Sequence, residues 1–580
     1  MFSYGSLISI FLTVQGYSNP ILKYWREGQF HKWPRDERNY SRFILQNGLD
    51  AFVVRTNTTE CAASMSIPIG YEQDPIDRPG MAHFLEHMLF LATEKYPIES
   101  EYKVRLHSCG GRSNAFTSYR ETNYFFSVNC ECFEEILDRF AQFFISPLFT
   151  KDSIERELYA IDSEHSKNIP RQSRRGHEVF KSIRDPSIPF TKFSTGNHTT
   201  LTNNVSYADL RQMVLDFHER FYSAHEMTLV LWTNTSSTRI KEVINEQYHQ
   251  IKRHNVERAP RTFANFNEYA FDTLVEVPSF DETSQYIDIT FTTPHTWDRY
   301  KHRIDPNYVI SGVLGDEGPF SLYQYLYSNG LITALSTSRS SNHQTISMRI
   351  SLTDSGSDNY LDVLTAVFDY IEMMKTKTND FGYFEEEKIA DLERTLSFDR
   401  SSNNPITFVY SVASLIGQLK DQAWFDEFFL RPQELIHGIS YVVNETISSE
   451  IFDEIIENLR PEKTSVIVYY PNATYDKYEP VYGQKYKLFD RKLSQLLKGH
   501  TQSASLSEPV LTYRIQILTY QKILQSKPIF QVDRFTINFL TPIVCLLQVV
   551  IPSQICFKMK FGEFQQDPFM MNRKQKYPWN

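Results

Sequence analysis

The five-residue run His83-Phe84-Leu85-Glu86-His87 limits how this chain of 580 residues can fold. Apolar residues recur at steps of three and four from Met81 to Leu91, which predicts a helix that begins after Pro79-Gly80. Residues four apart lie one turn apart on one helix face, so His83 and His87 can direct two imidazole nitrogens at one metal ion. The fold must therefore leave this face open to further ligands.

Glu86 lies beside the two histidines, where it can act on a water molecule at the metal without being a ligand. This order of residues is the reverse of the zincin motif and is known as the inverzincin pattern. Catalytic zinc takes three protein ligands and keeps one position open for water, so a third ligand must come from elsewhere. The alternative is a chance run in a packed core. With 16 histidines in the chain, a random sequence contains such a run about 0.03 times, which favours the metal site.

Strand and helix signals interleave along most of the chain. Asn47-Gly48 between two apolar runs predicts a β-hairpin. Further strands are expected at 61–69, within 113–128, and at 287–291, 346–352 and 464–470, and helices at 132–144, 153–165, 319–328 and 361–374. The elements do not follow a regular βαβ order, which predicts the α+β class. The predicted division is an N-terminal segment (1–29), two domains (30–250 and 251–498) and an atypical tail (499–580).

The charge balance restricts the partners. The chain has 60 Lys and Arg against 70 Asp and Glu, a net charge of −10, which argues against binding nucleic acid through phosphate contacts. The tail contains an apolar stretch at 535–557, long enough to span a bilayer, but two prolines and three amide side chains interrupt it. A membrane helix is therefore not expected, and no nucleic acid is expected as a partner.

Two features bear on the compartment. An apolar run at 7–14 resembles a short signal peptide, although residues 1–6 carry no Lys or Arg. Six cysteines are too few for a disulfide scaffold, and no CxxC pair suggests a structural zinc site. Seven Asn-x-Ser/Thr sequons would suit a secreted chain; they begin at Asn39, Asn57, Asn197, Asn204, Asn234, Asn444 and Asn472.

Several long motifs together resemble the insulin-degrading-enzyme branch of the pitrilysin family of zinc metallopeptidases. They are residues 80–90 (GMAHFLEHMLF), 111–118 (GRSNAFTS), 138–144 (DRFAQFF) and 156–165 (RELYAIDSEH). Weaker similarity continues through 315–319 (GDEGP) and 459–462 (LRPE) to about residue 498. The resemblance implies two related domains, each a β-sheet covered by helices, of which the first is catalytic and the second inactive. It also favours a cytoplasmic location, with secretion as the alternative.

The resemblance also implies roles for individual residues. Glu164 is expected to be the third zinc ligand. Glu157, two helical turns earlier, is expected to be one of the catalytic residues, with the task of supporting the zinc ligands. Segment 113–116 is expected to be an edge strand to which a peptide substrate adds as a further strand. The expected substrate-binding residues are Asn114 and Ala115 on this strand, Phe90 and Phe116 in a side-chain pocket, and Gly315 and Glu317 at a remote site for the substrate's N-terminus.

The chain departs from the family pattern in three ways. The resembled enzymes have four related domains around a chamber, and this chain matches only the first half. Arg174 and His177 stand where aromatic pocket residues are expected. The remote-site strand at 335–338 lacks the usual glycines, and residues 499–580 resemble nothing in the family.

These observations lead to one functional prediction with an alternative. The prediction is a zinc metalloendopeptidase that hydrolyses short, hormone-like peptides, with Zn²⁺ as cofactor and Glu86 activating the attacking water. The alternative is a catalytically weak half-molecule that binds peptides as a regulatory partner or needs a second chain. A homo-oligomer or a complementary C-terminal half would then complete the chamber.

Overall fold

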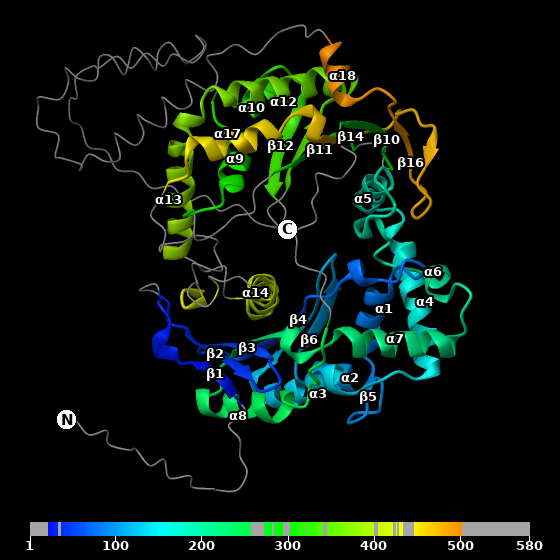
Figure 1. Cartoon of the computed structure of the whole chain (residues 1–580), viewed down its shortest axis with the longest axis vertical. Helices are drawn as coiled ribbons and strands as arrows, with labels where there is room; N and C mark the ends of the chain where they lie inside the picture. The colour runs from blue at the N-terminus through cyan, green and yellow to red at the C-terminus, as the bar shows by residue number, and fades with distance from the viewer. Residues whose placement is uncertain are drawn as a thin grey trace, which may run out of the picture. The chain divides into compact units, whose positions relative to one another are not determined.

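The structure is a computed structural model. It describes residues 21–32, 36–256, 272–280, 284–293, 302–319, 321–339, 345–398, 404–420, 425, 429–432 and 446–500. Two seven-stranded sheets with accompanying helices form the framework of these residues (Figure 1). Helices and strands interleave along the chain without a regular βαβ order, so the predicted α+β class is confirmed.

The first sheet carries the segment predicted to bind substrate. Its strand order is β1-β2-β3-β9-β4-β7-β6, with β3 and β9 parallel and the other pairs antiparallel. The predicted hairpin is β2 and β3, and Gly48 in its turn has φ of +89°, a conformation that glycine adopts readily. The strands are β1 (Ile21–Trp25), β2 (Asn39–Leu45), β3 (Asp50–Arg55), β4 (Glu60–Ile67), β6 (Arg112–Thr117), β7 (Thr122–Asn129) and β9 (Thr228–Thr233).

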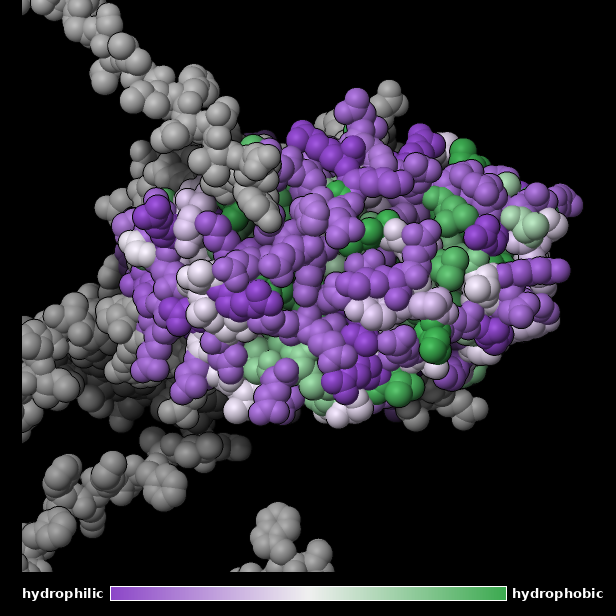
Figure 2. Space-filling view, turned by 90° about the horizontal axis from the view of Figure 1, so that it is seen from below, coloured by the Kyte–Doolittle hydropathy of each residue, from purple (hydrophilic) through white to green (hydrophobic). Residues whose placement is uncertain are grey.

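Helices cover one face of this sheet and build the larger hydrophobic core. Alternate residues of the strands, such as Ala51 and Val53 on β3, are buried against apolar helix residues such as Phe84 and Phe140. The side of the molecule below α3 and α8 is mainly hydrophilic with scattered hydrophobic residues (Figure 2). The helices of this half are α1 (Met81–Leu89), α2 (Glu101–Ser108), α3 (Phe133–Ile145), α4 (Lys151–Asn168), α6 (His198–Thr202), α7 (Tyr207–Phe221) and α8 (Ser237–Tyr248).

The other face of the first sheet is covered by α14 (Pro405–Leu419), a helix from the second half of the chain (Figure 1). Phe52 of β3 and Trp232 of β9 pack in one cluster with Phe408 and Val412 of α14. The helix lies close to the sheet at Gly417, where a Cβ atom would be 3.0 Å from the Oγ of Ser66. The central strands of the first sheet, such as β3 and β9, are therefore covered on both faces.

The second sheet has the order β12-β13-β11-β14-β10-β16-β15, with β10 and β14 parallel. Its strands are β10 (Thr273–Pro278), β11 (Tyr286–Thr292), β12 (Ile332–Arg339), β13 (Thr345–Leu352), β14 (Thr464–Tyr470), β15 (Lys477–Tyr478) and β16 (Lys485–Leu488). Helices of the same half cover one face and form a second core with it. They are α9 (Pro306–Leu314), α10 (Leu322–Ser328), α11 (Asp354–Asp358), α12 (Tyr360–Lys375), α13 (Gly382–Phe398), α17 (Ser449–Asn458) and α18 (Leu493–Lys498).

A helix from the first half lies against the second sheet. Val179 of α5 (Gln172–Ser182) packs with Val275, Ile467 and Tyr469 of that sheet. Gly176 permits this approach, because a Cβ there would lie 2.1 Å from the Oη of Tyr469. Each sheet thus receives one helix from the other half, and packing crosses the predicted domain boundary at 250–251, which stays a prediction.

Local differences from the sequence expectations are small. The helix expected at 319–328 begins at Leu322, because the Ser321 Oγ accepts the Gln324 N–H and caps it there. The strand expected at 61–69 ends at Ile67, and β5 (Ala92–Thr93) pairs with β8 (Pro147–Leu148) as a small extra sheet. The apolar runs at 7–14 and 535–557 lie outside the described residues. Among the helices that are described, none has the length and apolar character needed to cross a bilayer.

Candidate metal centre

The helix α1 carries the histidine pair, and its first turn is fixed by a buried carboxylate. Asp74 accepts the N–H groups of Gly80 and Ala82 at 2.7 and 2.8 Å, which satisfies donors that a helix start leaves free. Gly80 has φ of +99°, and a Cβ there would lie 2.3 Å from the Cα of Gly196. This packing fixes where α1 begins and therefore which side chains face outward.

His83 and His87 of α1 meet Glu164 of α4; helix spacing predicted the two histidines, and the resemblance implied Glu164. One ligand atom from each lies within 4.8 Å of the others, and the three side chains are partly exposed. The Nε2 atoms of His83 and His87 are 3.6 and 3.5 Å from the Glu164 Oε2. Among the described residues this is the group of His, Cys, Asp and Glu side chains arranged to hold a metal ion.

The donor set fits zinc. Two imidazoles and one carboxylate are a known ligand set of catalytic zinc sites, which keep a fourth position for water. Ligand atoms bonded to one tetrahedral zinc at about 2.0–2.2 Å are roughly 3.3–3.6 Å apart, close to the separations measured to the Glu164 oxygen. Binding a zinc ion there requires only small movements of these side chains.

Both histidines are oriented through their second ring nitrogen. The Nδ1 of His83 lies 2.8 Å from the backbone oxygen of Thr195, and the Nδ1 of His87 lies 3.2 Å from the Glu157 Oε2. With Nδ1–H donating to these oxygens, each Nε2 is left as the acceptor that can bind a metal. The structure therefore places Glu157 next to a ligand, where the resemblance predicted it.

The charges around the pair favour a cation. Burial acts to lower the pKa of His87, but hydrogen bonds to Glu157 and Glu164 and the charge of Glu86 raise it to about 9. The hydrogen bond with His87 lowers the pKa of Glu164 to about 2, with further help from the charge of His83. Three carboxyl groups thus surround two imidazoles, and a divalent ion would balance their charge.

Glu86 projects from α1 toward β6 and remains outside the ligand cluster. Its side chain is buried, and its Oε2 accepts a 2.6 Å hydrogen bond from the Thr117 hydroxyl on β6. Within the described part of the chain no group donates to the other oxygen, Oε1, which is therefore the atom left to accept a proton. Thr117 therefore fixes the orientation of the predicted general base.

Strand β6 lies at the end of the first sheet, and β7 is its partner among the described strands. Asn114 on β6 is exposed, whereas Ala115 and Phe116 are half-buried. Phe116 contacts the rings of Phe125 and Tyr410, the latter contributed by α14. The free edge and the exposed Asn114 agree with the expectation of strand addition.

The remaining predicted residue of the first half, Phe90, directly follows α1, and its N–H donates to the His87 backbone oxygen at 3.3 Å. Phe90 packs against the rings of Tyr102, Tyr124 and Phe143 at the edge of the first core, in a different aromatic group from that of Phe116. These ring contacts do not join the two phenylalanines, and their shared pocket stays a prediction.

Gly315 is the C-cap of α9 in the second half, and Glu317 follows it two residues later. A Cβ at Gly315 would lie 2.4 Å from the Oγ1 of Thr337 on β12. These two residues therefore border the second sheet, and the structure neither joins them to the metal ligands nor tests their predicted role.

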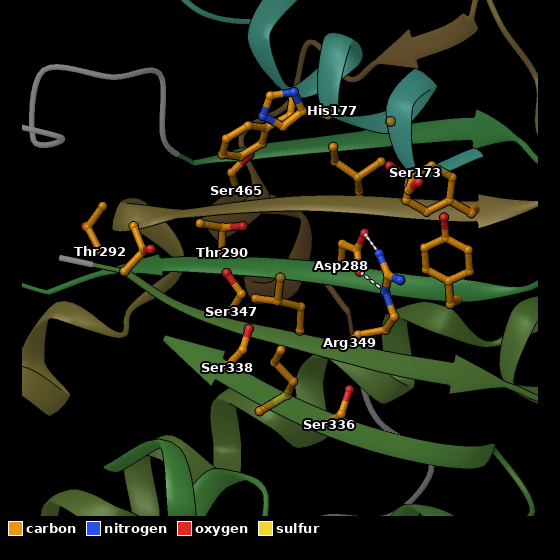
Figure 3. Close-up of a pocket in the computed structure, with 18 of the residues that line it drawn as sticks. Ser173, His177, Asp288, Thr290, Thr292, Ser336, Ser338, Ser347, Arg349 and Ser465 are labelled. Carbon is orange, nitrogen blue, oxygen red and sulfur yellow. Dashed lines mark hydrogen bonds and ion pairs between the residues drawn. The ribbon is translucent and has the colours of Figure 1, made fainter. Parts of the chain in front are cut away.

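A cavity of about 600 Å³ lies between α5 and the second sheet (Figure 3). Hydroxyl groups from four strands line it, and Asp288 and Arg349 form two hydrogen bonds of 2.7 and 2.8 Å on its wall. His177 projects into it from α5. Arg174, on the same helix, is exposed, and its charge contributes to lowering the pKa of Glu164. Of the two residues that depart from the family pattern, Arg174 thus acts on a residue of the metal centre and His177 lines this cavity, and their effect on substrate choice stays a prediction.

Sequence reasoning missed the residues that position the site: Asp74 at the start of α1, Thr117 beside Glu86, Thr195 beside His83 and Tyr410 beside Phe116. Asp74 precedes a Pro-Gly break before the helix, a signal that could have identified it. The other three contacts join distant segments and leave no local pattern.

Comparisons with known proteins agree with this geometry. Residues 51–187 match the family "Insulinase (Peptidase family M16)", and residues 209–389 match "Peptidase M16 inactive domain". The chain is 31% identical over 477 residues to insulin-degrading enzyme-like 1, peroxisomal, of Arabidopsis thaliana, covering 81% of this chain and 47% of that protein. It is also 31% identical over 481 residues to insulin-degrading enzyme of Homo sapiens, covering 81% of this chain and 45% of that protein.

A solved structure shows the same fold. The crystal structure of pitrilysin superposes with a TM-score of 0.69 at 19% identity, covering 82% of this chain and 50% of that one. The chain spans about half the length of the curated relatives it matches. The matches to both family domains, the similarity along most of the described residues and the shared fold agree, and the chain belongs to peptidase family M16, the insulinase family, as an insulysin-like member.

Proposed function

We propose that this chain is a zinc metalloendopeptidase that cleaves short peptides. The observation that carries the proposal is the convergence of His83, His87 and Glu164 on one point, with Glu86 next to them and bound to β6 through Thr117. A core histidine pair would need neither a third ligand nor an adjacent buried carboxylate. The membership in peptidase family M16 supports the peptidase reading.

The residues have distinct tasks in this proposal. His83, His87 and Glu164 would hold the zinc ion, which supplies polarisation of the scissile carbonyl and acidifies a water molecule. Glu86 accepts the proton of the attacking water at Oε1 and then donates it to the nitrogen of the leaving amine. Thr117 holds Oε2 so that Oε1 faces the water. Thr195 and Glu157 keep the two imidazoles in the required tautomer.

The substrate class follows from the strand beside the site. The free edge of β6 offers backbone groups to an extended peptide, and Asn114 and Ala115 would make these contacts. The strand is six residues long, so it can pair with a short extended segment of a substrate. This supports peptides and unfolded segments as substrates, with hormone-like peptides as the first class to test.

The experiment measures zinc content and cleavage of a quenched fluorescent peptide in the same preparations. The wild-type chain is expected to contain one zinc ion and to lose turnover with a chelator, regaining it when zinc is added. Glu86→Gln should keep the zinc but lower turnover ~10²–10⁴-fold, because an amide accepts no proton from water. Glu155→Gln, an exposed position on α4, is the matched control and should cleave at the wild-type rate.

Two results would contradict the proposal. Full zinc occupancy in a His83→Ala/His87→Ala double variant would show that the metal lies elsewhere. Wild-type turnover in Glu86→Gln would remove Glu86 as the base. Peptide binding by the wild-type chain with turnover no higher than that of Glu86→Gln would instead support the alternative, a peptide-binding half-molecule. Light scattering, alone and with the C-terminal half of a related enzyme, then tests for a second copy or a complementary chain.

A further inference from the structure

Four cysteines of the catalytic half are paired. Cys61 at the start of β4 is bonded to Cys130, and Cys109 at the end of α2 is bonded to Cys132. Their Cα atoms are 4.9 and 6.2 Å apart, inside the range of about 4.4–6.8 Å for bonded cysteines. Cys130 and Cys132 lie on one short turn between β7 and α3, so the two bonds attach this turn to two separate elements.

A shared metal ion does not explain these cysteines. Among the described residues, the group of His, Cys, Asp and Glu side chains suited to a metal ion is the one at His83, and it contains no cysteine. Cys61 and Cys109 are buried, where free thiols pack as small apolar groups without needing partners. The arrangement of all four in two bonded pairs therefore indicates oxidised cysteines, which persist in secretory and extracellular compartments and are rare in the cytosol.

The sequons provide an independent indication. Asn57 lies in the turn between β3 and β4, Asn204 before α7, and Asn472 after β14; all three side chains are exposed. A glycan attached at these positions would extend into solvent without displacing a packed residue. Two other sequons are less suited, because the Asn197 side chain caps α6 and the Asn234 Nδ2 donates to the Thr58 oxygen at 2.9 Å.

Both modifications meet near one corner of the first sheet. Thr59, the last residue of the Asn57 sequon, accepts the Cys130 N–H through its backbone oxygen at 3.0 Å. We propose that the chain matures in an oxidising secretory compartment, with disulfides Cys61–Cys130 and Cys109–Cys132 and N-linked glycans on Asn57, Asn204 and Asn472. This is the alternative to the cytoplasmic location that the family resemblance favours, and it goes beyond the proposed peptidase activity.

A secretory compartment supplies the co-reactants that both modifications need. Each disulfide forms when two thiols give two electrons and two protons to an acceptor protein disulfide, which becomes a dithiol. Each glycan forms when the asparagine Nδ2 bonds to C1 of an oligosaccharide carried on a polyprenyl diphosphate. The bond from C1 to the diphosphate oxygen breaks, and one amide proton is released.

The test uses the full chain isolated with an antibody from the cells that naturally express it. Free thiols are alkylated under denaturing conditions at lysis, and tryptic peptides are then analysed by mass before and after reduction. Cys61, Cys109, Cys130 and Cys132 are expected to be alkylated only after reduction. Treatment with peptide N-glycosidase should convert Asn57, Asn204 and Asn472 to aspartate, a gain of one mass unit at each site.

The proposal requires both results. Alkylation of the four cysteines without reduction overturns it, and so does unconverted asparagine at all three positions. In cells expressing variants, Asn57→Gln should remove one glycan from the intact mass, whereas Asn197→Gln, the matched control, should remove none. A mass loss only in the control would show that the assignment by exposure is wrong. All readouts are masses, so they are independent of whether the chain cleaves peptides.

Discussion

Arg175 on α5 joins the two halves of the chain, and replacing it should lower stability strongly. The buried guanidinium donates to the Gln484 side chain at 2.6 Å and to the backbone oxygens of Ile169, Tyr482 and Gly483 at 3.0, 2.9 and 3.1 Å. Burial lowers the pKa of Arg175, which shows that part of this interaction energy offsets the cost of desolvating its charge.

The magnitude follows from the groups left behind. In Arg175→Met, three backbone oxygens and one amide oxygen lose their donor, and each costs about 1–3 kcal/mol if it remains buried. Recovery of the desolvation cost and entry of water reduce the sum, so we expect a net loss of about 3–5 kcal/mol. At about 2 cal/mol/K per residue, a unit of roughly 500 residues has an unfolding entropy of about 1 kcal/mol/K, so the melting temperature should fall by roughly 3–5 °C.

Thermal unfolding followed by calorimetry measures this loss. Arg171→Met is the matched control, since this arginine precedes the same helix and its side chain is exposed; its melting temperature should change by about 1 °C or less. A melting temperature of Arg175→Met equal to that of the control would refute the reasoning. It would mean that water replaces the guanidinium without cost.

Three further predictions concern the site and the second half. Thr117→Val should lower kcat about tenfold with little change in KM, because it removes the hydroxyl that orients Glu86, and Thr117→Ser should restore the rate; equal kcat values in all three would oppose this role. Burial raises the pKa of Glu385 from 4.5 to about 7, so its contribution to stability is present below pH 4.5 and is lost as the pH rises through 7. The Glu385→Gln variant should therefore be more stable than the wild type at pH 8 by up to about 3 kcal/mol, and this difference in stability should become small by pH 5. A stability difference in melting curves that does not change with pH would contradict this. Replacing Arg174 and His177 with aromatic residues should shift cleavage toward large apolar residues just after the cut, and an unchanged profile across a peptide library would exclude it.

Much of the fold was predictable because its signals are local. The hairpin at Asn47-Gly48 and the helix at Met81 each depend on patterns within a dozen residues. The parallel pairing of β3 with β9 was not predictable in this way, since the two strands are far apart in sequence and carry no mark of their partner. The same holds for α14, whose apolar residues show that it is buried but not which sheet it covers.

The residues of the metal centre also differ in how far the sequence predicts them. His83, Glu86 and His87 were predictable from helix geometry alone, whereas Glu164 required the resemblance, because one sequence does not show which carboxylate reaches the pair. The cysteine pairing was not predictable, since the six cysteines of the chain allow about fifteen complete pairings and spacing does not choose among them. Both Glu164 and the cysteine pairing depend on contacts between segments far apart in sequence, which only the folded structure shows.

The late position of α14 in the chain delays the burial of one face of the first sheet during synthesis. The last strand of the first sheet ends at Thr233, and α14 begins only at Pro405, about 170 residues later. At about 5–20 residues per second, a ribosome needs roughly 10–30 s to supply the covering helix after the sheet is complete. During this interval the apolar face around Phe52 and Trp232 is open to water and to other chains. We therefore expect the nascent chain to be prone to aggregation at this stage, and a chain cut at the predicted domain boundary to keep that face exposed.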